Sequence, residues 1–165
     1  HFSCWRKNTL FFNVNIFFIS NYIGKRIDFC QDNKVESTNM VLRGLHFQAE
    51  PYSQTKLVSV SAGKIFDVVV DVRVESKTYG KYFTIELDSI SNRSLLVPKG
   101  FAHGFQTLED DSELIYLHSS LYTPSNEGAL NVLDKKLKIK WPRDVINLSE
   151  RDKNHPYLNS KFKGI

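Results

Sequence analysis

The sequence is poor in cysteine and lacks the common motifs that bind zinc or nucleotide phosphates. Its 165 residues include two cysteines, Cys4 and Cys30, and neither belongs to a C-x-x-C pair or a His/Cys cluster. This argues against a structural zinc site. No P-loop or Rossmann glycine pattern occurs either, so side chains must hold any phosphate that the protein binds.

The charge balance does not indicate a nucleic-acid-binding protein. The chain has 22 Lys and Arg against 18 Asp and Glu, a formal net charge of +4, and its basic residues are spread along the sequence. It contains no RNP, KH, zinc-finger or basic-helix pattern. Such a mild excess fits a phosphorylated small molecule at least as well as nucleic acid, and we predict no nucleic-acid partner.

No hydrophobic run is long enough to span a membrane. Arg6 and Lys7 precede an apolar stretch over 10–19, which resembles the start of a signal peptide. The stretch contains two Asn, is too short to cross a bilayer and lacks an A-x-A-like cleavage site. We therefore expect a core strand there, no membrane contact and a cytoplasmic location.

Short segments of strand type dominate the middle of the chain. Hydrophobic residues make up 41% of the sequence, which is typical of a globular domain, and we expect one domain over 1–165. Apolar and β-branched segments separated by turn signals predict strands at 57–60, 65–72, 82–87, 95–97, 102–108 and 113–117. This pattern indicates an all-β sandwich or barrel. After Pro142 we expect a helix over 144–149, with Ser149 capping a short turn through Asp152.

One segment, RGLHFQ (43–48), places a histidine among polar residues on a predicted strand. Alternate residues of a strand share a face, so His46 and Gln48 point the same way, and Gly44 leaves room beside them. Taken alone, each residue fits an ordinary core or surface position. Tyr116 and Tyr122, six residues apart, share a face if their strand is regular.

A second segment, PKGFAHGF (98–105), has the P-x-G-x-x-H shape of cupin barrels and raises the hypothesis of a metal site. Metal-binding cupins use an H-x-H pair followed by a carboxylate, whereas this chain has His46 and Gln48, followed by Lys56. A Lys ammonium has no lone pair and repels a cation. The site suits a developing oxyanion better, and we predict no metal or other cofactor.

Eight segments in order resemble the dTDP-4-dehydrorhamnose 3,5-epimerase family, a metal-free branch of the cupin fold. RGLHFQ and PKGFAHGF are the distinctive ones. The segments lie within residues 29–158 and are FCQDNKVEST (29–38), VLRGLHFQ (41–48), QTKLVSV (54–60), GKIFDVVVDVRVESKTYGKY (63–82), LLVPKGFAHGF (95–105), YLHSSLYTPSNE (116–127), IKWP (139–142) and LSERD (148–152). The resemblance implies a cupin-type jelly roll with short C-terminal helical segments.

The resemblance implies an isomerase that inverts C3 and C5 of dTDP-4-dehydro-6-deoxyglucose to give dTDP-4-dehydrorhamnose. The C4 carbonyl of such a sugar acidifies the protons on C3 and C5, so a base can remove one and an acid can return one to the opposite face through an enolate. By resemblance, His46 is the base and Asp152 orients it. Tyr116 is then the acid, and Lys56 stabilises the enolate oxygen.

The resemblance also implies residues that hold the sugar. Arg43 and His103 match pocket residues near the sugar and the oxyanion. Tyr122 matches an aromatic residue that shapes the sugar pocket. Gln48, which shares the face of His46, completes this predicted set.

Another group matches contacts to the nucleotide. Gln31 and Asn33 match polar contacts, Phe2 matches a residue of the N-terminal nucleotide segment, and Arg151 is placed to bind the diphosphate. Family members are dimers that exchange N-terminal strands. We therefore expect a homodimer in which residues 29–38 serve the neighbouring subunit.

The sequence departs from the family pattern at both ends. Because the chain begins at His1, most of the family's D-x-R-G-x-F-x-E segment is expected to be missing, and Cys4 stands in place of its Glu. The family's W-N-D appears as Val132-Leu133-Asp134 in a loop expected to lie toward the ligand. Three alternatives stay open: a C3-only epimerase, an epimerase of another nucleotide-linked 4-keto sugar, and a non-catalytic sugar-nucleotide-binding cupin.

Overall fold

A computed structural model describes residues 24, 26–38, 40–159, 162 and 164–165 of the chain. In this part the chain forms strands, one 3-10 helix (η1) and one short α-helix (α2). Their bounds are β1 (Gln31–Ser37), β2 (Val41–Gln48), β3 (Lys56–Ala62), β4 (Lys64–Asp71), β5 (Tyr82–Asp88), β6 (Ser94–Val97), β7 (Phe101–Thr107), β8 (Ser112–His118), η1 (Pro124–Asn126), β9 (Glu127–Ala129), β10 (Asn147–Leu148) and α2 (Glu150–Lys153).

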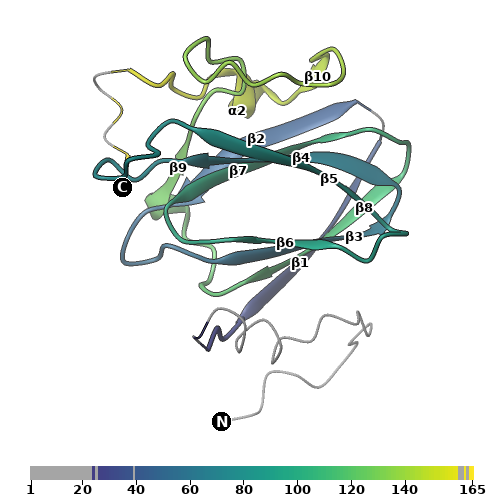
Figure 1. The fold of residues 1–165 in the computed structure, drawn as a ribbon, viewed down its shortest axis with the longest axis horizontal. Helices are drawn as coiled ribbons and strands as arrows, with labels where there is room; N and C mark the ends of the chain where they lie inside the picture. Colours follow the sequence, from purple (N-terminus) through teal and green to yellow (C-terminus); the bar gives the residue numbers. More distant parts are fainter. Residues whose placement is uncertain (1–23, 25, 39, 160–161, 163) are drawn as a thin grey trace.

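The strands form two sheets that face each other (Figure 1). One sheet has the order β1-β8-β3-β6, and the other has the order β10-β2-β7-β4-β5, with β9 also paired to β2. The pairs are antiparallel except for the parallel pair of β10 with β2. The structure thus confirms the predicted all-β architecture of two sheets.

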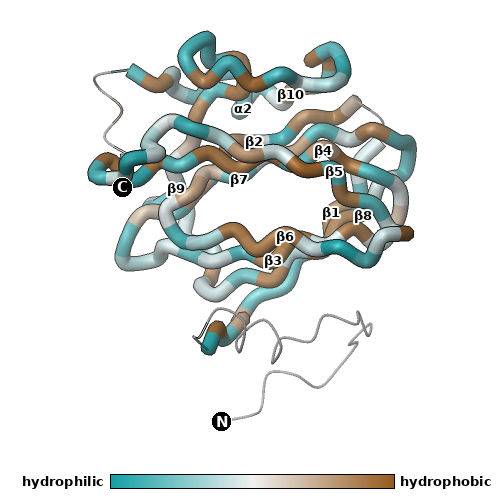
Figure 2. Tube along the Cα trace, in the orientation of Figure 1, coloured by the Kyte–Doolittle hydropathy of each residue, from teal (hydrophilic) through white to brown (hydrophobic). Residues whose placement is uncertain are grey.

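The sequence of β4 explains how the larger sheet is covered on both faces. Ile65 and Val69 belong to an apolar cluster that also contains Val58 of the facing sheet. Val68 and Val70 point the other way and pack in a second cluster with residues of the C-terminal segment. A strand buried on both faces has a nearly continuous apolar run. Along the strands, apolar and polar stretches alternate (Figure 2).

The strands predicted over 57–117 are confirmed, with ends that shift by one or two residues. The helix predicted over 144–149 is wrong. Residues 147–148 instead form β10, which pairs with β2, and Leu148 packs in the outer apolar cluster. Ser149 does cap the short helix α2, because its Oγ accepts a hydrogen bond of 3.0 Å from the backbone N–H of Asp152.

The N-terminal predictions lie outside the described residues. These are the strand or signal-like stretch over 10–19 and the roles of Phe2 and Cys4. Among the residues that the structure does describe, no helix has the length and apolar character needed to cross a membrane.

Candidate active site

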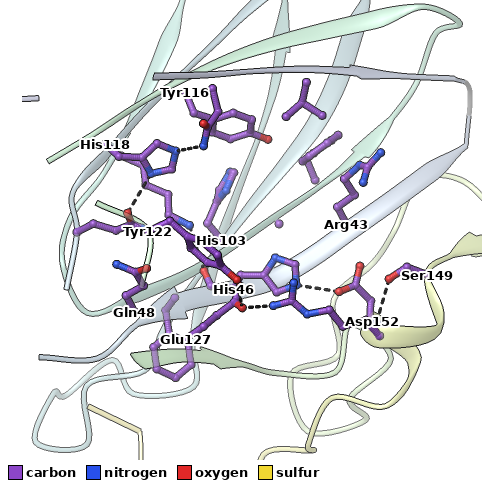
Figure 3. A pocket seen from close by; sticks show the side chains of 18 residues that line it. Arg43, His46, Gln48, His103, Tyr116, His118, Tyr122, Glu127, Ser149 and Asp152 are labelled. Carbon is purple, nitrogen blue, oxygen red and sulfur yellow. Dashed lines mark hydrogen bonds and ion pairs between the residues drawn. The ribbon is translucent and has the colours of Figure 1, made fainter. Parts of the chain in front are cut away.

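A cavity of about 320 Å³ lies between the two sheets, and strands of both sheets line it (Figure 3). Gln31 does not line this cavity. The structure does bring most of the predicted site residues together there, although they are far apart in the sequence. The predicted residues that line it are Asn33, Arg43, His46, Gln48, Lys56, His103, Tyr116, Tyr122, Arg151 and Asp152.

His46 projects from β2 toward a carboxylate on the C-terminal segment. Its Nε2 lies 2.8 Å from Oδ1 of Asp152 in α2, as Figure 3 shows. The Asp152 side chain is 5% exposed and that of His46 is 26% exposed. Burial raises the pKa of Asp152, but hydrogen bonds from His46, Ser149 and His155 outweigh burial and hold that pKa below its ordinary value. Asp152 is therefore a carboxylate at neutral pH.

His155, which sequence reasoning missed, contacts the same carboxylate. Its Nε2 lies 3.0 Å from Asp152 Oδ1 and 3.2 Å from His46 Nε2. Within the described ranges, these three side chains form the one group of His and carboxylate atoms close enough to hold a metal ion. Hydrogen bonds from both rings to the same carboxylate oxygen already account for the short distances. The predicted absence of a metal stays a prediction.

A second histidine–carboxylate pair lies deeper in the fold. His103 on β7 is 4% exposed, and its Nε2 lies 2.6 Å from Oδ1 of Asp67 on β4, which is fully buried. In the described part of the chain, Oδ2 of Asp67 is buried without a hydrogen-bond partner. Sequence reasoning missed Asp67. An ionisable residue inside the apolar run 65–72 is a signal that could have found it.

Tyr116 stands on β8, in the sheet that faces His46. The edge of its ring meets the His103 ring with centroids 5.8 Å apart, and it stacks on His118 at 5.9 Å. Burial, followed by the charge of Asp67, raises the pKa of the Tyr116 phenol well above its ordinary value. The hydroxyl is therefore protonated at neutral pH and can act as a proton donor.

Lys56 on β3 is a buried cation at the same cavity. Burial lowers the pKa of its ammonium to about 8, although the carboxylates of Glu127 and Asp67 oppose the shift. Its Nζ donates a hydrogen bond of 3.4 Å to the backbone carbonyl of His46. Lys56 is thus mostly charged at pH 7, in surroundings where a positive charge acts strongly on a nearby anion.

Three side chains form a network at one side of the cavity. Glu127, at the start of β9, accepts a hydrogen bond of 2.8 Å from the Tyr122 hydroxyl and forms an ion pair with Arg151. The hydrogen bond to Glu127 raises the pKa of Tyr122. The strand β8 ends at His118, so Tyr122 reaches the cavity from a loop and not from the strand face that it was expected to share with Tyr116.

The side chains of the two predicted glutamines, Gln48 and Gln31, form hydrogen bonds with backbone groups. The Gln48 amide donates to the carbonyls of Tyr52 and Leu121 at 2.7 and 3.2 Å and accepts from the N–H of Thr123 at 2.7 Å. Oε1 of Gln31 accepts a hydrogen bond of 2.8 Å from the Tyr122 N–H. Both residues therefore fix the loop that carries Tyr122.

Asn33 and Arg43 line the cavity, and Asn33 lies beside a histidine that sequence reasoning missed. Nδ2 of Asn33 is 3.4 Å from Nε2 of His118, whose other ring nitrogen meets Oε1 of Gln54 at 3.1 Å. Burial, then the charges of Lys56 and His103, lowers the pKa of His118 to about 4. His118 is therefore neutral at pH 7. Arg43 is exposed on β2.

Neither Val132 nor Leu133, the residues expected to lie toward the ligand, lines this cavity. Val132 is 2% exposed and packs in the outer apolar cluster, whereas Leu133 is 51% exposed and lies beside a separate surface cavity. The Val132 side chain therefore supports the packing of the C-terminal segment.

The two-sheet β fold of cupin type, with a buried cation and histidine–carboxylate pairs between the sheets, defines a class of protein: isomerases with a cupin-type fold. The sequence model of one family, described as dTDP-4-dehydrorhamnose 3,5-epimerase, matches residues 11–160. The chain belongs to the dTDP-4-dehydrorhamnose 3,5-epimerase family.

Individual relatives agree with this assignment. The dTDP-4-dehydrorhamnose 3,5-epimerase of Shigella flexneri is 42% identical over 143 residues, which cover 87% of this chain and 78% of that protein. The dTDP-6-deoxy-D-glucose-3,5-epimerase of Legionella pneumophila Philadelphia 1, solved with dTDP-4-keto-L-rhamnose, has a TM-score of 0.85 at 37% identity and covers 90% and 79% of the two chains. A 3'-monoepimerase of Streptomyces bikiniensis, solved with dTDP-quinovose, has a TM-score of 0.81 at 36% identity and covers 86% and 72%.

Proposed function

We propose that this protein inverts C3 and C5 of dTDP-4-dehydro-6-deoxyglucose and so produces dTDP-4-dehydrorhamnose. The observation that carries the proposal is the pair of His46 and Asp152, which borders a cavity that also holds Lys56 and Tyr116. Family membership supports the sugar nucleotide as substrate, and the solved relatives with dTDP-linked ligands support dTDP as its nucleotide.

In this mechanism, neutral His46 removes the proton from the carbon next to the C4 carbonyl. The charge of Asp152 stabilises the imidazolium that forms and holds the ring in place. The Lys56 ammonium stabilises the enolate oxygen that develops at C4. Each of these residues borders the same cavity.

Tyr116 is the proposed acid that returns a proton. His46 and Tyr116 project from facing sheets, so a sugar bound between them would meet the two side chains on opposite faces. Inversion at a carbon requires removal and return of the proton on opposite faces, which supports this division of roles. The raised pKa of Tyr116 keeps its proton available at neutral pH.

For the nucleotide part of the substrate, we propose Arg151 as the contact to the diphosphate and Asn33 as a contact to the nucleotide. Arg151 is 55% exposed in its ion pair with Glu127, so phosphate oxygens can reach its guanidinium. A homodimer that exchanges N-terminal strands remains part of the proposal, because β1 is an edge strand of its sheet. The cytoplasmic location stays a prediction.

The direct test is to incubate the protein with dTDP-4-dehydro-6-deoxyglucose in D2O and to analyse the sugar by mass spectrometry. We expect two deuteriums, at C3 and C5, and no uptake with the His46→Ala variant. One deuterium, at C3, would establish a C3-only epimerase, as the name of the Streptomyces bikiniensis relative describes. Binding of the sugar nucleotide without uptake, repeated with GDP- and CDP-linked sugars, would establish a non-catalytic protein.

A comparison with Tyr116→Phe assigns the acid. This variant should still exchange protons with solvent but should form inverted product more slowly than it exchanges. Equal retention of both rates would rule out Tyr116 as the acid.

A further inference from the structure

A single carboxylate oxygen is shared by two imidazoles. Oδ1 of Asp152 lies 2.8 Å from Nε2 of His46 and 3.0 Å from Nε2 of His155. The two ring nitrogens are 3.2 Å apart, and the rings meet edge to face at an angle of 85°. The geometry therefore makes His155 a direct competitor of His46 for the charge of Asp152.

The backbone around His155 is fixed by buried polar contacts. Asn131 is only 1% exposed. Its side-chain amide donates hydrogen bonds to the carbonyls of Lys153 and His155 at 2.9 and 3.3 Å. The Asn131 N–H donates to the carbonyl of Pro156 at 2.9 Å. Pro156 also restricts the residue before it to extended conformations. The His155 ring is thus held beside Asp152 by the fold.

We propose that His155 is a positioning residue for the base. It donates its Nε2–H to Asp152 Oδ1, and this limits how strongly Asp152 attracts a proton onto His46. The proposal rests on the proposed function, because it assigns His46 the role of base. Its consequence is that His46 stays unprotonated, and able to accept a substrate proton, at a lower pH than it would beside an unshared carboxylate.

The electrostatics of the cluster agree with this role. Burial, followed by the nearby charge of His46, lowers the pKa of His155, so His155 is a neutral hydrogen-bond donor at neutral pH. Two imidazole rings this close repel each other if both are positively charged. The other charged or titratable groups that border the cavity are Arg43 on β2, Lys56 on β3, His103 on β7, Tyr116 and His118 on β8, Tyr122 in the loop after β8, Glu127 on β9 and Arg151 on α2.

Two substitutions separate hydrogen bonding from packing. His155→Gln keeps a neutral N–H donor near the position of Nε2, and His155→Leu removes the donor but keeps an apolar side chain. Lys153→Gln, which changes an exposed side chain two residues before His155, is the matched control. Thermal unfolding checks that each variant folds, and kcat/KM is then measured between pH 5 and 9.

In His155→Leu, we expect the acid limb of the kcat/KM profile to move up by roughly half a pH unit or more, since Asp152 then acts on His46 alone. The loss of activity should be about threefold or more at pH 6 and small at pH 8. His155→Gln should restore most of the wild-type profile, and Lys153→Gln should match wild type.

Several outcomes would overturn the proposal. If the kcat/KM profile of His155→Leu matches wild type, His155 does not position the base. If kcat/KM falls equally at every pH, the role of His155 is structural only. Loss of wild-type activity with EDTA, restored by Zn²⁺, would make the cluster a metal site. If the wild-type protein shows no epimerisation, the proposed function fails separately. NMR titration of the His46 ring then still tests the contact, because His155→Leu must shift its midpoint upward.

Discussion

The cavity borders two histidine–carboxylate pairs that share their chemistry and differ in their surroundings. The pair of His46 and Asp152 joins β2 to the C-terminal segment, and the histidine side chain is 26% exposed. The pair of His103 and Asp67 joins the neighbouring strands β7 and β4 of the larger sheet, with side chains 4% and 0% exposed. Its hydrogen bond is also shorter, at 2.6 Å against 2.8 Å.

The difference shows how burial assigns roles to identical residue types. His46 can meet a substrate, and its carboxylate is shared with His155. His103 is packed edge to face with Tyr116, so its pair fixes the position of the proposed acid. We therefore expect changes to the accessible pair to reduce activity first and changes to the buried pair to reduce stability first.

The largest expected effect comes from Asp152→Asn. This change keeps the shape of the side chain but removes the charge that orients and stabilises His46, so deuterium uptake should fall by roughly 10²–10⁴-fold. The rate is measured by mass spectrometry of the sugar. Glu150→Gln, an exposed neighbour on the same helix, should retain the wild-type rate. Uptake within threefold of wild type in Asp152→Asn would contradict the account.

The next largest effect concerns stability and the buried pair of His103 and Asp67. Asp67→Ala removes the buried partner of His103 and should lower the free energy of unfolding by about 1.5–3 kcal/mol. Urea denaturation followed by circular dichroism measures the change. Asp152→Ala, measured alongside, should cost less stability. The reverse order would show that the accessible pair is the structural one.

The pH dependence of Lys56 gives a smaller effect. Because burial lowers the pKa of its ammonium to about 8, the charge is present below pH 8 and is lost as the pH rises through it. The rate of epimerisation should therefore decline on the alkaline side with a midpoint near 8. Lys56→Arg carries a group that stays charged, so its alkaline limb should lie at higher pH. If wild type and Lys56→Arg lose activity with the same alkaline midpoint, the charge of Lys56 does not control the rate.

The smallest effect concerns Ser149, which caps α2 and positions Asp152. Ser149→Ala removes the hydrogen bond to the Asp152 N–H and should cost about 1 kcal/mol of stability. It should also lower kcat/KM modestly, because the carboxylate loses its fixed position. Ser149→Thr keeps the hydroxyl and should rescue both quantities. Failure of the threonine variant to rescue would assign the effect to packing.

The sequence predicted those parts of the fold and site that local patterns determine. Alternating apolar segments located the strands, and the family resemblance located His46, Tyr116, Lys56 and Asp152. The helix expected over 144–149 is wrong because residues 147–148 pair with β2, which lies about a hundred residues earlier in the chain.

The missed residues depend on tertiary contacts. Asp67 meets His103 because β4 and β7 are neighbours in the sheet, and 36 positions separate the two residues. His155 meets His46 across a separation of 109 residues. Glu127 joins Arg151 only where β9 and α2 come together beside the cavity. No spacing within one segment predicts such contacts.

In the proposed mechanism His46, and not His103, removes the substrate proton. This role is tested most directly by measuring deuterium uptake from D2O for His46→Asn and His103→Asn side by side. We expect no uptake at C3 or C5 with His46→Asn, and measurable uptake with His103→Asn together with a lower unfolding temperature. Wild-type uptake by His46→Asn, with none by the folded His103→Asn variant, would contradict it.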